Sequence, residues 1–363
     1  MTGTYSSRIL TGFSLAVLCA AAAAPVAATD ADYGYGFYRT VEGEALLTTL
    51  EDDAEALEIE PNYPVLVGDR LWVPAGARVE AVLPDKSVLR LGEETEVFFE
   101  SLTGSADAAD DATTILHLLE GEMQVVGESY VLSDDPVRID TSNSRVFLQF
   151  PGTYRLTSDG RGWTEVVVRG GFAEINTERG SVVLRDGESA EIAGDDRPEV
   201  SIAAAGSWNR LERWGAELSN EALAGVENVD ASLGYAAAPL ERSGYWVSVT
   251  GRRAWRPSVR VGWRPYSDGW WVHTPSGLSW VAYEPWGWVT SHYGAWDYLP
   301  GYGWLWFPGA SYSPAWVYWY WGPTHTAWVP TGYYTRFYGP RYGWDFHYGV
   351  YGWAGGYWDS WSH

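Results

Sequence analysis

The stretch Gly-Tyr-Trp-Val-Ser-Val-Thr-Gly-Arg-Arg-Ala-Trp-Arg-Pro at residues 244–257 decides the fold, because its pattern returns farther along the chain. Trp246, Trp271 and Trp296 stand 25 residues apart. A second series follows them: Trp255, Trp280, Trp306 and Trp328. Three of these, Trp255, Trp306 and Trp328, open the phrase Trp-x-Pro. Self-similarity at a fixed period indicates one small structural unit that is used several times.

Each unit is predicted to be a β-hairpin. Aromatic and β-branched residues flank Pro/Gly turns, which is the sequence signal of a hairpin. The paired segments are 245–249 with 254–257, 270–273 with 279–281, and 295–298 with 304–307. A single hairpin is marginally stable in water, so the units must pack on one another. We therefore expect residues 243–330 to form a Trp-rich β-repeat whose evenly spaced indoles fill its core.

Aromatic residues outside this period are the candidates for ligand contact. Indole faces stack on sugar rings and hold cations, so exposed ones offer a binding platform. With the neighbouring His292 and Arg264, the candidate contact residues are Trp286, Trp288, Trp319 and Trp321. The alternative for His292 is a hydrogen bond within a turn. No catalytic, cofactor or metal site is predicted, because His273, His292 and His325 lack metal-ligand spacing and no catalytic motif occurs.

Charge divides the chain into two parts. Residues 29–205 hold 36 acidic and 13 basic residues, a net charge of −23, whereas residues 244–363 hold 5 acidic and 7 basic residues, a net charge of +2. So acidic a surface disfavours binding to nucleic acid or anionic lipid. Because the asymmetry lies within one chain, we expect the arginines of the second part to dock on the acidic part, with stacking on the aromatic rings or contact with an anionic ligand as the alternatives: Arg252, Arg253, Arg256, Arg260 and Arg264.

The acidic part, residues 38–202, is predicted to be an antiparallel β-sandwich or roll. Short alternating runs such as 77–83 and 87–91 are separated by Gly, Asp and Pro turns. An ordered series of motifs here resembles the FecR-like domain: Val41-Glu42-Gly43-Glu44, Val67-Gly68-Asp69-Arg70-Leu71, Leu83-Pro84-Asp85-Lys86, Leu119-Glu120-Gly121-Glu122, Pro151-Gly152-Thr153-Tyr154-Arg155 and Val168-Arg169-Gly170-Gly171. The resemblance implies an extracytoplasmic β domain, which in FecR senses an outer-membrane event. Only eight residues precede the apolar leader, so we expect the cytoplasmic regulatory segment of FecR to be lacking.

One helix is predicted between the two parts, over residues 207–224. Trp208, Leu211, Trp214 and Leu218 recur at helical spacing, with Ser207 as the candidate N-cap and Gly225 beyond the end. We expect a strut that packs on one of the β parts; a partner-binding helix is the alternative. The fold class is therefore all-β with one linking helix.

The Trp-rich part also resembles a known family. Five motifs carry the match: Trp263-Arg264-Pro265-Tyr266, Glu284-Pro285-Trp286-Gly287-Trp288, His292-Tyr293-Gly294-Ala295-Trp296, Pro300-Gly301-Tyr302-Gly303-Trp304 and Pro314-Ala315-Trp316-Val317. They are similar to a Trp-rich domain of unknown function that commonly follows FecR-like domains in bacterial secreted proteins. That family implies a location outside the cytoplasm and an arrangement of two domains, but no activity.

The ends of the chain complete the expectations. Arg8, a charge-free run from Ile9 to Thr29 and small residues before Ala28 predict a signal peptide over residues 1–28 and export to the periplasm or beyond. An uncleaved membrane anchor is the alternative, and no later segment is apolar enough to span a bilayer as a helix. Residues 331–363, rich in Gly, Tyr and Trp, are expected either to lie on the repeat or to stay mobile.

These observations favour an exported, non-catalytic protein of the bacterial cell envelope. It is expected to bind or scaffold a glycan or another envelope protein through exposed aromatic rings. The competing hypothesis is a FecR-like sensor component that reports ligand binding to a separate membrane partner.

Overall fold

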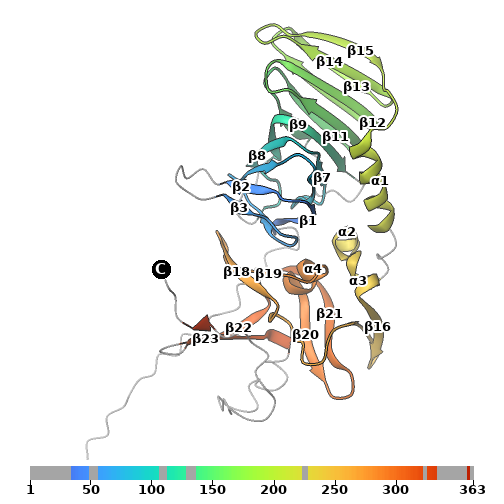
Figure 1. The fold of residues 1–363 in the computed structure, drawn as a ribbon. Coiled ribbons are helices and arrows are strands. Elements are labelled where there is room, and N and C mark those ends of the chain that lie inside the picture. The colour runs from blue at the N-terminus through green and yellow to red at the C-terminus, as the bar shows by residue number, and fades with distance from the viewer. Residues whose placement is uncertain are drawn as a thin grey trace, which may run out of the picture.

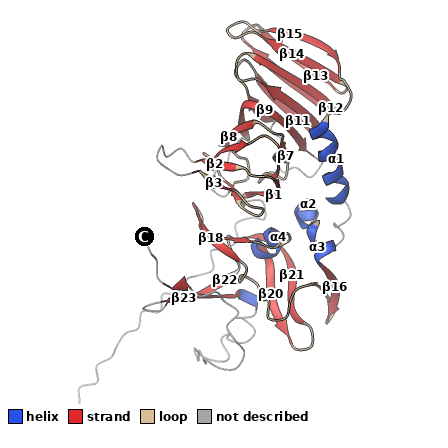
Figure 2. Ribbon diagram, viewed as in Figure 1, coloured by secondary structure: helices blue, strands red, loops and turns tan. Residues whose placement is uncertain are grey.

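The computed structural model describes residues 34–48, 56–105, 113–127, 136–222, 228–321, 325–332 and 358–359. The predicted signal peptide, residues 1–28, and most of the tail after residue 332 lie outside these ranges. Strands dominate the described chain and the helices are few and short (Figure 2). The all-β prediction is confirmed. No described helix is long and apolar enough to cross a membrane.

The N-terminal part contains fifteen strands that form one continuous sheet. The strands are β1 (Gly36–Glu42), β2 (Leu46–Thr48), β3 (Leu57–Glu58), β4 (Pro64–Val65), β5 (Arg70–Val73), β6 (Arg78–Val82), β7 (Val88–Leu91), β8 (Thr95–Ser101), β9 (Ile115–Gly127), β10 (Val137–Asp140), β11 (Arg145–Ser158), β12 (Trp163–Thr177), β13 (Gly180–Arg185), β14 (Glu188–Ala193) and β15 (Glu199–Ala204). All pairings but one between named strands are antiparallel; β9 and β10 run parallel. The outer edge of this sheet is β15, which lies at the end farthest from the C-terminal part (Figure 1).

The long strands β9, β11 and β12 bend the sheet into a roll. The register of β11 on β12 shifts between Gln149 and Tyr154, where β-bulges let the strands turn. Asn143, which precedes β11, then donates its side-chain amide to the carbonyls of Gly162 (2.8 Å) and Ile192 (3.1 Å). Arg145, two residues after Asn143, pairs with Asn176 near the end of β12, whereas Gly162 directly precedes the start of β12. The Asn143 bonds therefore bring the two ends of β12 toward each other.

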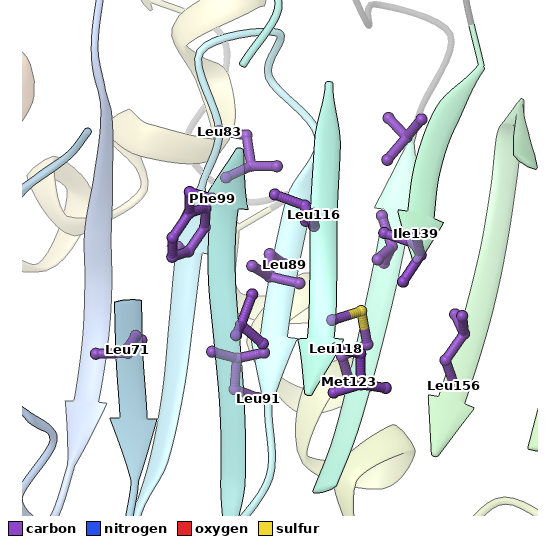
Figure 3. Close-up of a cluster of buried hydrophobic side chains, with 14 of the residues drawn as sticks. Leu71, Leu83, Leu89, Leu91, Phe99, Leu116, Leu118, Met123, Ile139 and Leu156 are labelled. Carbon is purple, nitrogen blue, oxygen red and sulfur yellow. The ribbon is translucent and has the colours of Figure 1, made fainter. Parts of the chain in front are cut away.

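A single aliphatic core fills this roll. Leu71, Leu89, Phe99, Leu116 and Leu156 are all fully buried and converge from different strands (Figure 3). Alternation along each strand sends every second side chain inward, which is why short apolar-polar runs were sufficient to predict the strands.

Helix α1 (Arg210–Ala222) lies within the stretch 207–224 in which a helix is predicted, and it packs against β7 and β9. Asn209, and not Ser207, caps it: the Asn209 side chain accepts from Glu212 N–H (3.0 Å) while Glu212 accepts from Asn209 N–H (2.8 Å). This reciprocal pair is a capping box. Leu211 and Trp214 are buried, but Trp208 precedes the helix and is 45% exposed.

Three short helical segments, which the sequence did not indicate, follow α1. They are η2 (Ala231–Leu233), α2 (Gly234–Ala237) and α3 (Pro239–Ser243). They lead into the Trp-rich part, which consists of β16 (Gly244–Val249), β17 (Arg252–Pro257), β18 (Gly269–Thr274), β19 (Gly277–Ala282), α4 (Gly287–His292), β20 (Tyr293–Leu299), β21 (Gly303–Tyr312), β22 (Val317–Trp321), β23 (His325–Pro330) and β24 (Trp358–Asp359). In Figure 1 these elements lie together at the end of the roll near β1.

Candidate functional site

The Trp-rich part is built from four hairpins, each with one tryptophan directly opposite another. The cross-strand pairs are Trp246 with Trp255, Trp271 with Trp280, Trp296 with Trp306, and Trp319 with Trp328. The three hairpins predicted from the repeat are present with the expected strands, and β22–β23 adds a fourth. Directly opposed residues are the side chains in closest contact across a sheet, so each hairpin holds its own indole pair.

The indoles of the four hairpins meet in one shared core. Trp255, Trp296 and Trp306 are almost completely buried, and Trp246 is partly buried against them. Edge-to-face contacts connect the rings, such as Trp271 with Trp328 at 5.3 Å between centroids. Aromatic rings favour this geometry because the positive ring edge meets the negative face. The prediction that the evenly spaced tryptophans are interior is confirmed for Trp271 and Trp296, whereas Trp246 is only partly buried.

Three buried residues of the N-terminal roll belong to the same core: Tyr35, Phe37 and Val82. Tyr35 and Phe37, beside or within β1, are buried among the indoles. Phe37 lies flat on Trp288, with 4.6 Å between the ring centroids and 8° between their planes. The two parts of the chain therefore share an apolar interior rather than touching only through charges.

Asn62 of the roll also fixes the backbone of the Trp-rich part. Its side-chain amide donates to the carbonyls of Ala282 (2.9 Å) and Glu284 (2.8 Å), and its side-chain oxygen accepts from Trp288 N–H (3.1 Å). Asn62 has a φ of 69°, a left-handed conformation that asparagine tolerates better than most residues. One buried side chain thus satisfies three backbone groups at the entrance to α4.

The expectation that the off-period aromatics are the exposed ones is wrong for Trp288. That ring is 3% exposed because α4 inserts it against Phe37. Trp286 is partly buried against Trp255, with 5.5 Å between the centroids. Trp319 is not off-period, since it takes the place in the fourth hairpin that Trp296 takes in the third. The side chain of Trp321 lies outside the described residues.

His292 is fully buried at the end of α4. Its Nδ1 lies 3.0 Å from the carbonyl oxygen of Ser313, and its ring lies 4.1 Å from that of Trp288 between centroids. Burial lowers the pKa of His292 to about 4, so the ring is neutral near pH 7. Of the two interpretations drawn from the sequence, this geometry matches the hydrogen bond within the fold and excludes an exposed contact.

The exposed rings of the Trp-rich part are mainly tyrosines. The sequence interpretation missed them: Tyr245, Tyr283, Tyr298, Tyr302 and Tyr318. Alternation offered the signal, because Tyr245 and Tyr318 each precede a core tryptophan and must face the opposite side of their strand.

The arginines do not dock on the acidic roll, which corrects that expectation. Arg252 lies over the ring of Phe307 (4.9 Å to the centroid) and Arg256 over that of Tyr245 (5.6 Å). Arg253 donates to the Asn228 side chain, and Arg260 lies 3.4 Å from the carboxylate of Asp268. Arg264 is partly exposed. It does not line the groove that is described in the next paragraph.

A groove of about 310 Å³ opens beside the fourth hairpin. It is lined by Ser276 and Leu278 of the β18–β19 hairpin, by Pro314 and Ala315 before β22, and by Trp319 of β22. The hydroxyl of Tyr35 donates to Ser276 Oγ (2.9 Å), which ties one wall to the N-terminal roll. Pro314 is held by its carbonyl, which accepts from Trp280 N–H (3.1 Å).

The groove has the composition of a small binding site. Trp319 offers a partly exposed indole that packs on Trp271 at 4.6 Å, so its orientation is set by the core behind it. Ligand pockets are typically concave, largely apolar and about 300–1,000 Å³ in volume. Among the described residues, no group of three or more His, Cys, Asp or Glu side chains is placed to hold a metal ion.

Comparison with known proteins shows that the Trp-rich part is similar to a known family. Residues 237–335 match the model of a family of unknown function, DUF6600. No curated protein matches the chain. Two crystal structures of candidate anti-sigma factors from Parabacteroides distasonis ATCC 8503 resemble it. The first is 17% identical, with a TM-score of 0.32. The matched region covers 41% of this chain and 64% of that protein. The second is 14% identical, with a TM-score of 0.31. The matched region covers 52% of this chain and 99% of that protein.

Proposed function

We propose that this protein is an exported, non-catalytic component of the bacterial cell envelope that binds a glycan in the groove beside Trp319. The observation that supports the proposal most is the groove itself, whose one aromatic wall is an indole fixed by Trp271 and Trp328. An indole with a preset orientation loses little entropy when a sugar ring stacks on it. Retention in the envelope would follow from this contact and from the leader predicted at residues 1–28.

A polar group in the groove lining suits a hydroxyl-rich ligand. Ser276 brings a hydroxyl to the lining of the groove, where its oxygen also accepts a hydrogen bond from Tyr35. A sugar presents an apolar ring face and a rim of hydroxyls, so the indole and this hydroxyl would be contacted together. Leu278 and Ala315 complete the apolar side.

The test is retention of the purified protein on insoluble bacterial murein. Trp319→Ala should weaken retention roughly fivefold, since a ring stack contributes about 1 kcal/mol and 1.4 kcal/mol corresponds to a factor of ten. Trp319→Phe should keep part of the binding. Tyr302→Ala, which removes an exposed ring at the tip between β20 and β21, is the matched control and should retain the wild-type level.

A second variant separates binding from stability, because Trp319 also packs on the core. Ala315→Phe leaves Trp319 in place and adds bulk at another residue of the groove lining. It should abolish retention while the thermal unfolding midpoint stays near that of the wild type. Undiminished murein binding by a folded Ala315→Phe protein would reject the groove as the site.

A sensor role is the second candidate, and the shared core favours it. Phe37 and Asn62 connect the roll directly to α4 and to the strands beside the groove. Occupancy of the groove could therefore alter the roll, as expected of a FecR-like sensor domain. Recovery of a membrane signalling protein on the immobilised chain, with release when murein fragments are added, would favour this role over simple retention.

A further inference from the structure

The strand at the outer edge of the roll, β15, has the features of a pairing surface. Within the described chain it bonds only to β14, so its other side carries no neighbour. Ile202 in this strand is 48% exposed, and Trp208 beyond its end is 45% exposed. An unprotected edge with apolar side chains is a template for another strand, and proteins usually blunt such edges with lysine, proline or bulges. Residues 199–205 contain none of these.

The hydrogen-bond pattern shows which groups of β15 point outward. Ala205 N–H donates to Gly187 O (2.8 Å) on the β14 side, and Gly194 N–H, at the end of β14, donates to Gly162 O (2.8 Å) on the β12 side. In an antiparallel pair, alternate residues bond to alternate sides. Ser201 and Ala203 therefore bond to β14, whereas Val200, Ile202 and Ala204 direct their N–H and C=O groups away from the sheet.

The exposure of Ile202 has a cause in the topology. Beyond β12 one half of the roll ends at β13, while the other half continues through β14 to β15. Ile202 is paired with the buried Ala190 and so faces the core side of the sheet, but no described strand covers it there. A further strand added to β15 would extend this apolar face.

We propose that β15 pairs antiparallel with β15 of a second copy of this chain, about a two-fold axis at Ile202. In this register Ile202 exchanges hydrogen bonds with Ile202 of the second copy, and Val200 lies opposite Ala204. The only charged residue of the strand, Glu199, then lies opposite Ala205, so no like charges meet. Glu199 is also paired with Arg179 of its own chain at 3.3 Å.

Charge at the strand ends favours the same partner. The turn before β15 contains the exposed Asp195, Asp196 and Arg197 and so keeps a net negative charge. The two-fold axis brings this turn toward the beginning of α1 in the second copy, where Arg210 and Arg213 are exposed. The positive end of the helix dipole lies there as well. Because β15 is the end of the roll away from the Trp-rich part, both grooves stay accessible in the dimer (Figure 1).

The first test is the mass of the purified protein in solution by sedimentation over a concentration series. The wild type should approach twice the mass of one chain as concentration rises. Ile202→Pro should stay monomeric, because it removes only an outward N–H and leaves the β14 ladder intact. Val183→Lys, an equally drastic change at a 44% exposed position on β13, should still dimerise.

The second test keeps the proposal falsifiable if Ile202→Pro fails to fold. In a Cys19→Ser background, which removes the only cysteine, Ile202→Cys should form a disulfide-linked dimer on mild oxidation. Hydrogen-bonded antiparallel partners have Cα atoms about 5.5 Å apart, within disulfide range. Ser201→Cys should not form this disulfide, because in the proposed register the two copies of Ser201 are not opposite each other and their side chains lie on the other face of the sheet. A monomeric wild type at all concentrations, dimers of a folded Ile202→Pro, or equal cross-linking of both cysteine variants would overturn the proposal.

Discussion

Phe37 of the first strand and Trp288 of α4 lie face to face, 4.6 Å apart, although 251 positions separate them in sequence. This stack connects the acidic roll to the Trp-rich hairpins. Removing one of the two rings should destabilise both parts at once.

Phe37→Ala should lower the free energy of unfolding by about 3–5 kcal/mol, the usual cost of truncating a buried aromatic side chain. Chemical denaturation measures the free energy of unfolding. Tryptophan fluorescence reports on the Trp-rich part, and circular dichroism reports on the strands. Tyr302→Ala is the control, since its ring is exposed. A loss confined to the fluorescence transition would contradict a shared core.

Asn62→Ala should cost about 2–4 kcal/mol. The variant leaves buried backbone groups at Ala282, Glu284 and Trp288 without their partner, and it places alanine in a left-handed conformation. Asn62→Gly restores only the backbone freedom, so it should recover a small fraction of the loss. If both variants unfold at the wild-type denaturant concentration, the three bonds do not stabilise the junction.

Glu80 is the only carboxylate paired with Arg39 and Arg90 among the described salt bridges. All three side chains are buried, and Tyr235 of α2 donates to Glu80 at 2.7 Å. Glu80→Gln should therefore destabilise the protein by about 3–5 kcal/mol, because two buried guanidinium groups lose their counter-charge. Glu93→Gln is the matched control: it breaks an exposed pair with Arg210 and should cost less than about 1 kcal/mol. Similar losses in urea unfolding for the two variants would argue against this difference.

Stability should fall as the pH is lowered from 6.5 toward 4, through His292. Its pKa is about 4 in the folded protein because burial penalises the charged ring, and about 6.5 when unfolded. Between these values the unfolded chain binds the extra proton, so the free energy of unfolding decreases with falling pH. From pH 7 to 4.5 the contribution is about 2–3 kcal/mol.

His292→Gln isolates this contribution. The variant should show a pH dependence of unfolding that is shallower than that of the wild type over the same window, whatever its stability at pH 7. Identical slopes for the two proteins would mean that His292 is not held neutral by the fold.

Local pattern was sufficient to predict the hairpins. Trp246 and Trp255 are nine residues apart and face each other across one turn, so the spacing of tryptophan, glycine and proline carries the pairing. The same local argument predicted the strands of the roll and the region of α1. Trp319 was misplaced because its hairpin departs slightly from the 25-residue spacing, whereas the strand register shows its equivalence.

Contacts between distant segments could not be predicted in this way. Charge asymmetry suggested that Arg252 and Arg256 face the acidic roll, but they lie over Phe307 and Tyr245 of their own sheet. Exposed charges attract weakly across a screened distance, while burial of aromatic surface is worth more. The junction instead uses Phe37 and Asn62, which no local signal marks, and the groove combines two turns that are remote in sequence.

Scanning calorimetry of the whole chain tests most directly the claim that the roll and the Trp-rich hairpins form one folded unit. The shared core predicts a single heat-absorption peak whose calorimetric enthalpy equals its van 't Hoff enthalpy, and one lowered peak for Phe37→Ala. Two separate peaks in the wild type, with only one of them shifted by Phe37→Ala, would contradict it.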